Sequence, residues 1–147
     1  MVEIVVHGLP RPQGSKRHVG NGIMREASAY VGEWRQDVAA AAARQYQGPP
    51  LGGPLSLEIE FRFPRPKSHF GTGRNATVLK PDAPSFVVSR KYGDLSKLIR
   101  STEDAISATS GFPVVEDDSL FVLVRARKVY ASEEKPVGAV VLVTQAT

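Results

Sequence analysis

The sequence predicts a single α+β domain over residues 1–147, with two main helices packed on a mixed β-sheet. Three observations predict this class. Two segments carry apolar residues at helical spacing, and four others have the alternation or apolar runs of strands. The predicted order is strand, helix, strand, long loop, helix, strand, strand, which favours helices layered on one sheet. The chain is also long enough to bury a core.

The first half of the chain predicts a strand, a helix and a second strand. Residues 4–9 form the first strand, which the Pro10–Gly14 cluster stops. A helix begins near Ser28, which can cap it, and ends at Gly48–Pro50. Residues 55–63 alternate apolar and polar side chains and indicate a half-buried strand. The apolar positions of the helix are Val31, Trp34, Val38, Ala41 and Ala42.

The second half begins with a segment, residues 64–93, that is rich in Pro and Gly and has no sustained period. A loop this long in a compact domain is more often functional than idle, although disorder is a competing interpretation. Residues 95–108 return to helical spacing, and strands follow at 120–130 and 139–143 with a turn at 132–136 between them. The apolar face of the second helix is Leu95, Leu98, Ile99, Thr102, Ala105 and Ile106.

Composition excludes several classes of protein. The chain has no cysteine, which rules out disulfides, thiolate zinc sites and a cysteine nucleophile, and fits a reducing cytoplasm. No stretch approaches the length of a membrane span, and the N-terminus lacks the layout of a signal peptide. We therefore expect a cytoplasmic protein with no membrane segment and no small-molecule cofactor.

The charge favours a polyanionic partner. The net charge is +4 and the pI about 9.6. Basic residues gather in groups, several of them in loop-like segments from which a backbone can reach outward to phosphates. A solvated surface that only aids solubility is the alternative. Our candidates for DNA contact are Lys16, Arg17, Lys67 and Arg74.

Two acidic positions stand out. Asp94 lies where the long basic loop meets the second helix, and Asp117-Asp118 lies just before a strand. Each has an ordinary explanation, because an aspartate that opens a helix usually caps it and paired aspartates before a strand usually form a turn. The segment between them suggests a catalytic function instead.

That segment resembles the central motif of the RusA-type Holliday junction resolvases. The family pattern is Asp-Leu-Asp-Asn/Lys-Leu, a basic residue, Asp-Ala-Leu, and then Asp-Asp-Ser/Ala before a strand. Here Gly93-Asp94-Leu95-Ser96-Lys97-Leu98 leads to Arg100 and Asp104-Ala105-Ile106, and Val115-Glu116-Asp117-Asp118-Ser119 follows. The opening Gly8–Gly14 and the segment His69–Pro84 look like actinobacterial and phage members. The resemblance spans most of the chain.

The resemblance implies specific roles. Asp94 and Asp118 match metal ligands, with Asp117 beside the second, and Arg100 holds the place of a basic catalytic residue that is usually lysine. Lys97 falls where the family has Asn or Lys, and we count it among the DNA-contacting residues. The implied cofactor is Mg²⁺ or Mn²⁺, and the implied function is recombination and repair by a homodimer that cuts a four-way junction.

Ser96 departs from the pattern, because the second carboxylate of Asp-Leu-Asp belongs there. Three explanations are open. The metal site works with fewer ligands, the residue has been changed so that the enzyme is inactive, or another carboxylate takes the place of the missing one. Ser96, Arg100, Glu103 and Ser107 share one helical stripe, so we hypothesise that Glu103 supplies the missing ligand. The competing explanation is that Glu103 pairs with Arg100 or Lys97 on a wet surface.

Two other functions compete with the nuclease. Ser96 suggests a catalytically impaired protein that binds branched DNA without cutting it. A single-strand or RNA-binding module ranks last, because it needs exposed aromatic side chains for stacking. Phe61 and Phe63 are predicted to point inward, which leaves only Tyr30, Tyr92 and Tyr130 free.

Overall fold

A four-stranded mixed sheet forms the centre of the protein in a computed structural model that describes residues 1–14, 16–18, 24–26, 30–107, 110–111 and 113–147. The strand order is β1-β6-β4-β5. Strands β1 and β4 run antiparallel to β6, whereas β4 and β5 are parallel. The mixed sheet of the predicted α+β class is therefore confirmed. The bounds are β1 (Val2–His7), β4 (Leu55–Phe63), β5 (Phe121–Tyr130) and β6 (Gly138–Gln145).

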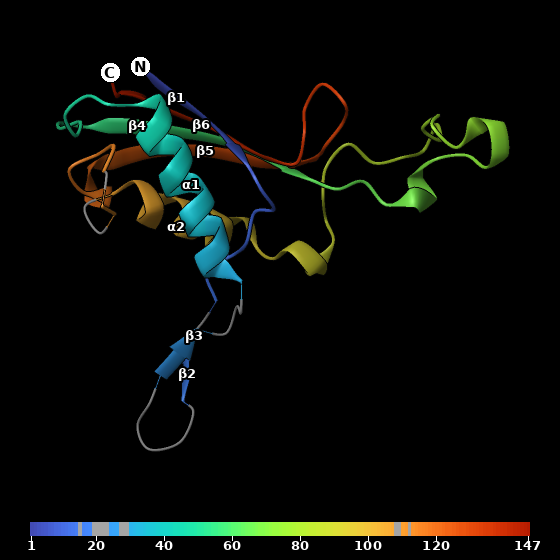
Figure 1. The fold of residues 1–147 in the computed structure, drawn as a ribbon, viewed down its shortest axis with the longest axis horizontal. Helices are drawn as coiled ribbons and strands as arrows, with labels where there is room; N and C mark the ends of the chain where they lie inside the picture. The colour runs from blue at the N-terminus through green and yellow to red at the C-terminus, as the bar shows by residue number, and fades with distance from the viewer. Residues whose placement is uncertain (15, 19–23, 27–29, 108–109, 112) are drawn as a thin grey trace.

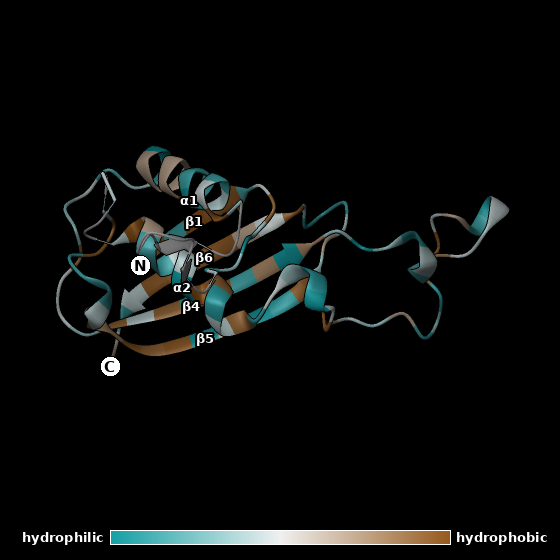
Figure 2. Ribbon diagram, turned by 90° about the horizontal axis from the view of Figure 1, so that it is seen from below, coloured by the Kyte–Doolittle hydropathy of each residue, from teal (hydrophilic) through white to brown (hydrophobic). Residues whose placement is uncertain are grey.

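Helices α1 (Val31–Gln45) and α2 (Leu95–Ile106) cover the same face of this sheet (Figure 1), and Figure 2 shows them in front of the strands from below. The apolar side chains of β4 alternate inward as predicted, and each is at most 1% exposed. They form the middle of the core between the sheet and the helices. No helix in the described ranges is long and apolar enough to cross a membrane.

A buried polar contact joins the two helices. Trp34 Nε1 on α1 donates a hydrogen bond of 3.1 Å to Thr102 Oγ1 on α2, and both side chains are fully buried. The Thr102 hydroxyl in turn donates to the Leu98 carbonyl at 2.9 Å. An indole N–H buried without a partner would lose its hydration uncompensated, so this bond selects one rotation of α2 against α1.

Several boundaries differ from the prediction, and one element was not predicted. Helix α1 begins at Val31 after Tyr30, which makes no side-chain capping bond, and Ser28 lies outside the described residues. Strand β1 ends at His7 because Gly8 takes a φ of +139° and turns the chain before Leu9. The segment that follows contains a short hairpin that the sequence analysis missed, β2 (Lys16–His18) paired with β3 (Met24–Glu26). Strands of three residues are too short to show a period.

Residues 64–93, which we call the arm, project from one end of the sheet (Figure 1). The arm contains only three short 3-10 turns, η1 (Lys67–His69), η2 (Gly73–Asn75) and η3 (Arg90–Tyr92), so the prediction of a long loop is confirmed. It folds back on itself where Phe70 pairs with Leu79 and the Lys80 N–H donates to the His69 carbonyl at 2.9 Å. The arm is therefore a hydrogen-bonded protrusion.

Replacing Thr102 by valine should destabilise the fold by about 1–3 kcal/mol, because Trp34 Nε1 then stays buried without an acceptor. Urea unfolding, followed by the fluorescence of the single tryptophan, measures the change. Thr102→Ser keeps the hydroxyl and is the matched control. A Thr102→Val protein as stable as the parent would show that the Trp34 bond does not hold the helices together.

Candidate active site

An open hollow lies where the outer side of α2 faces the turn before β5. Its volume is about 340 Å³, and it is lined by Ser96, Ile99, Arg100, Glu103 and Asp118. Four of these residues come from successive turns of α2, and Asp118 comes from the turn η4 (Asp118–Leu120). The structure therefore brings Ser96, Arg100 and Glu103 of the predicted stripe together with Asp118.

Backbone hydrogen bonds fix Asp118 relative to α2. The N–H groups of Val114 and Val115 both donate to the Ile106 carbonyl, at 2.9 and 3.1 Å. Two residues before Asp118, the Glu116 N–H donates to the Leu51 carbonyl at 3.0 Å. The segment that carries Asp118 is thus tied to the last turn of α2 and to the chain entering β4. This explains how residues fifteen positions apart, Glu103 and Asp118, meet in one hollow.

Glu103 is partly buried and experiences the charge of Asp118. Its pKa is raised from an ordinary 4.5 to about 7, first by burial of the carboxylate and then by repulsion from Asp118 and Asp104, with Arg100 opposing. The proposed surface pair with Arg100 or Lys97 is absent, because no ion pair within 4.0 Å in the described chain includes Glu103. Glu103 therefore differs from an ordinary solvated carboxylate.

Asp94 opens α2 as its N-cap residue, but its side chain makes no capping hydrogen bond. Asp94 therefore does not cap the helix through its side chain, which is the usual role of an aspartate at this position. Its carboxylate is exposed and makes no hydrogen bond to the helix end. Asp94 does not line the hollow. It precedes Glu103 by nine residues, which corresponds to roughly 13 Å along the helix axis.

Asp117 has the turn-forming role that paired aspartates commonly have. Its Oδ2 accepts hydrogen bonds from the Ser119 N–H and hydroxyl, and the Ser119 hydroxyl in particular lowers the pKa of Asp117. The side chain is fully exposed and does not line the hollow. Of the two neighbours, only Asp118 faces α2.

None of the residues predicted to contact DNA whose side chains the structure describes lines the hollow. Lys97 is exposed on α2, and Lys67 and Arg74 are exposed on the arm, in η1 and η2. Lys16 and Arg17 belong to β2 in the hairpin, and their side chains lie outside the described part of the structure. The hairpin and the arm leave the body in different directions (Figure 1).

Ser107 was predicted to share the wet stripe, and this was wrong. It is only 4% exposed, because α2 ends at Ile106 and Ser107 adopts an extended conformation at the C-cap. Helical periodicity no longer governs where its side chain points. Its hydroxyl donates to the Asp104 carbonyl at 3.4 Å.

The sequence analysis also missed how the Pro10–Gly14 segment packs on α2. The Ser101 hydroxyl donates to the Arg11 carbonyl at 2.7 Å, and the Gln13 N–H donates to the Lys97 carbonyl at 2.9 Å. A Cβ on Gly93, whose φ is +87°, would come within 2.6 Å of Pro12. These contacts tie the segment leading to the β2–β3 hairpin to the start of α2. Glycine before Asp94 was the one sequence signal of such a close approach.

All three tyrosines predicted to be free are engaged, although Tyr30, which has the Arg11 guanidinium 4.9 Å from its ring centre, stays 53% exposed. Tyr92 stacks on Phe63 with ring centres 4.5 Å apart, which buries part of its ring. Tyr130 carries the Arg65 guanidinium over its face and His69 at its edge. Both rings support the base of the arm, so they are not stacking platforms for bases.

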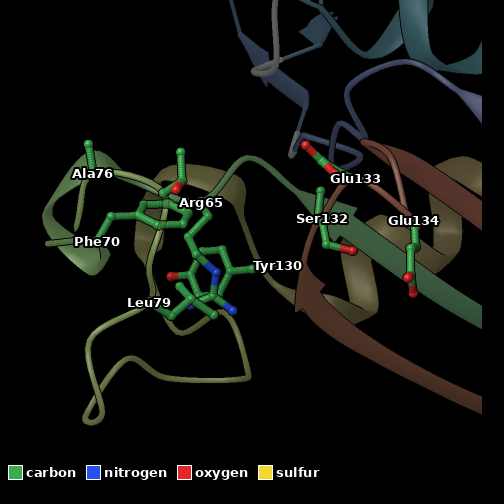
Figure 3. Close-up of a pocket in the computed structure, with 10 residues that line it drawn as sticks. Arg65, Phe70, Ala76, Leu79, Tyr130, Ser132, Glu133 and Glu134 are labelled. Atoms are coloured by element: carbon green, nitrogen blue, oxygen red, sulfur yellow. The ribbon is translucent and has the colours of Figure 1, made fainter. Parts of the chain in front are cut away.

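Figure 3 shows the larger hollow beside Tyr130, of about 770 Å³. It lies between the arm and the turn that joins β5 to β6, where Glu133 and Glu134 line it with Arg65. Arg65 is already held by Tyr130 and by the Pro84 carbonyl at 2.8 Å. This hollow therefore lacks the convergent groups of the smaller one.

Within the described ranges, no three histidine, aspartate or glutamate side chains gather closely enough to form a metal site by themselves. The hollow offers two facing carboxylates, Glu103 and Asp118, with the Ser96 side chain and the Arg100 guanidinium. Mg²⁺ commonly binds proteins through one or two carboxylates and keeps several waters. The donor set therefore fits a magnesium ion that also binds a phosphate, rather than a fully enclosed metal site.

Comparison with known proteins agrees with the motif. The sequence model of the family Endodeoxyribonuclease RusA matches residues 7–142, nearly the whole chain, including every residue of the hollow. No curated protein matches the chain. A match over this length cannot come from the short acidic motif alone. The chain belongs to the RusA endodeoxyribonuclease family.

Proposed function

We propose that this protein is a Mg²⁺- or Mn²⁺-dependent endonuclease that resolves Holliday junctions as a homodimer. The observation that carries the proposal is the hollow in which Arg100 and Glu103 of α2 face Asp118. Family membership supports the endonuclease activity, and the hollow supports a site for it within the region that the family match covers.

Asp118 and Glu103 are the residues that we propose would hold the cation. The raised pKa of Glu103 indicates that two carboxylates repel each other in a partly dehydrated place, and a divalent cation between them would relieve that repulsion. Asp94, which is exposed and opens α2 two residues before Ser96, is the further carboxylate that we propose as a ligand. Asp117, already engaged with Ser119, would at most support Asp118.

The chemistry requires charge stabilisation. When bound, a hard divalent cation stabilises the extra negative charge on the attacked phosphate and supplies hydroxide near neutral pH. Arg100 remains protonated, so its role is to hold a phosphate oxygen and not to donate a proton. Its position between Ser96 and Glu103 on the same side of α2 suits that role, because the guanidinium lines the hollow that a phosphate would enter.

The basic protrusions would bind the DNA arms. Lys67 and Arg74 on the arm, Lys97 on α2, and Lys16 and Arg17 on the hairpin lie on different parts of the molecule. Contacts to phosphates from several directions suit a branched substrate and predict binding that weakens steeply with salt. A four-way junction is approximately two-fold symmetric, so a two-fold dimer would present two equivalent sites for paired nicks.

The second candidate is a branched-DNA-binding protein with impaired catalysis. Ser96 favours it, because this side chain lines the hollow at the place where the family pattern has a carboxylate. Both candidates bind junctions, so cleavage separates them.

Replacing Asp118 by asparagine should reduce junction cleavage at least about 100-fold, because the uncharged amide no longer holds the cation against Glu103. Junction binding should persist, since no DNA-contacting cation is lost. The measurement is cleavage of a labelled synthetic four-way junction with Mg²⁺ or Mn²⁺, beside a gel-shift assay. Cleavage by Ser96→Asp alone, with an inactive parent, would establish the impaired protein instead.

Replacing Glu103 by glutamine should weaken Mn²⁺ binding by about 10- to 100-fold and slow cleavage correspondingly. Calorimetric titration with Mn²⁺ gives the affinity without reference to activity. Glu116→Gln is the matched control, because Glu116 is an exposed carboxylate near Asp118 that does not line the hollow. If Glu103→Gln cleaves junctions as fast as the parent, Glu103 does not replace the missing carboxylate.

The metal-free protein should lose stability as the pH rises from about 4.5 to 7. The folded pKa of Glu103 lies above its ordinary value, so the folded state binds the proton more tightly and loses that advantage when the carboxylate ionises. Glu103→Gln should therefore show a smaller fall in Tm between pH 5 and pH 8 in the presence of a chelator. Equal falls in the two proteins would mean that Glu103 titrates normally.

A further inference from the structure

Arg35 on α1 differs from an ordinary solvated arginine. Its side chain is 31% exposed, and its Nε is buried without a hydrogen-bond partner in the described chain. Ion pairs in such partly dehydrated places contribute little to stability, because apolar side chains of similar volume often do as well. An explanation for this guanidinium therefore has to come from the groups that it connects.

The guanidinium of Arg35 bridges two segments that are far apart in the sequence. Its Nη2 atom donates a hydrogen bond to Gln13 Oε1, in the Pro10–Gly14 segment, and lies 3.6 Å from Asp104 Oδ2 on α2. Arg35 itself belongs to α1. A single side chain of α1 therefore contacts both the segment that leads to the β2–β3 hairpin and the helix that lines the hollow.

Gln13 is held at two points. Its N–H donates to the Lys97 carbonyl of α2 at 2.9 Å, and its side chain accepts the bond from Arg35 of α1. One attachment leaves a segment free to pivot about it, whereas two attachments to different helices also fix its direction. Strand β2 begins at Lys16, three residues after Gln13, and Figure 1 shows that the hairpin projects away from the sheet and the helices. The hold on Gln13 therefore lies at the root of this projection.

We propose that Arg35 is a positioning residue for DNA binding, which acts through Gln13 to set the direction of the hairpin relative to the hollow. This role rests on the proposed function, in which the basic residues of the hairpin contact the junction. Asp104, the other partner of Arg35, directly follows Glu103 of the hollow. The same guanidinium thus ties the hairpin to the part of α2 that carries the hollow, and a junction that contacts both finds them already in one fixed arrangement.

Arg35 is placed to hold protein groups and not to bind a DNA phosphate. Its Nη2 is engaged by Gln13 and Asp104, and its Nε is enclosed by protein. The Asp104 carboxylate, 3.6 Å from Nη2, also repels an approaching phosphate. Since the salt dependence of DNA binding reflects the number of phosphates that a protein neutralises, the loss of Arg35 should weaken binding without changing that dependence.

Replacing Arg35 by methionine should therefore raise the Kd for a four-way junction about 10-fold, with the parent's slope of log Kd against log salt concentration. Gln13→Ala should have the same effect, and the double variant should bind no more weakly than either single one, because both changes remove one link. Fluorescence anisotropy of a labelled junction without divalent metal gives the Kd at several salt concentrations. Arg44→Met is the matched control, since Arg44 is an exposed arginine of α1, and it should bind as the parent does.

Cleavage separates positioning from a general loss of structure. With Mg²⁺ present, Arg35→Met should raise KM about 10-fold and leave kcat within about 2-fold of the parent, because none of the residues that line the hollow is changed. Urea unfolding followed by the fluorescence of Trp34 checks that the variant is folded. If Arg35→Met does not fold, Gln13→Ala carries the same test with the same two readouts.

Parental binding by folded Arg35→Met and Gln13→Ala would overturn the positioning role and leave the nuclease standing. Additive losses in the double variant would show that the two residues act separately, and a salt slope reduced by about one would show that Arg35 binds a phosphate itself; either result contradicts the role. A parent that binds no junction overturns the proposed function together with this role. A parent that binds junctions without cutting them leaves the Kd measurements to decide it.

Discussion

The placement of α2 is the constraint on which the site depends. The Trp34–Thr102 hydrogen bond holds α2 against α1, and the Ser101–Arg11 bond holds it against the segment leading to the hairpin. Bonds from Val114 and Val115 to Ile106 then return the chain from the end of α2. Because these contacts set the rotation of α2, they also decide that Arg100 and Glu103 face Asp118. Arg100 and Glu103 are three residues apart and therefore lie on the same side of α2, because each residue turns the helix by about 100°. A rotation of α2 about its axis would move both side chains away from Asp118 together.

The hollow concentrates negative charge in a place that water reaches only in part. Burial and the charge of Asp118 both raise the pKa of Glu103, and Arg100 compensates only partly. Such repulsion is unfavourable for the folded chain alone and becomes useful when a cation occupies the place. Ser96 is uncharged and lines the same hollow as Glu103 and Asp118. A carboxylate at position 96 would be a third negative charge there and would increase the repulsion between these side chains. The same helix thus carries both the departure from the family pattern and its proposed compensation.

The rest of the fold keeps this site accessible. Both helices lie on one face of the sheet (Figure 2). The hollow is lined by exposed or partly exposed residues of α2 and by Asp118, and not by fully buried core residues. Lys67 and Arg74 lie on turns of the arm that contribute no buried residue, and the arm residue that belongs to the hydrophobic core is Val87. Strand β5 lies next to both the hollow and the arm. It begins shortly after Asp118, and near its end the Lys128 carbonyl accepts a hydrogen bond from the Val87 N–H of the arm.

The sequence by itself determined the two helices, the four main strands and the long loop. A helix or strand that is buried on one side has apolar residues at regular spacing, as in the five inward side chains of β4. It also singled out Asp94, Arg100, Glu103 and Asp118 as chemically suited to a metal-dependent nuclease. Only the tertiary structure decided which of them meet. Asp94 lies beyond the hollow, Asp117 turns to Ser119, Ser107 is buried past the helix end, and Glu103 reaches Asp118. Periodicity records which side of an element is buried, whereas the convergence of distant side chains depends on long-range hydrogen bonds that leave no local pattern.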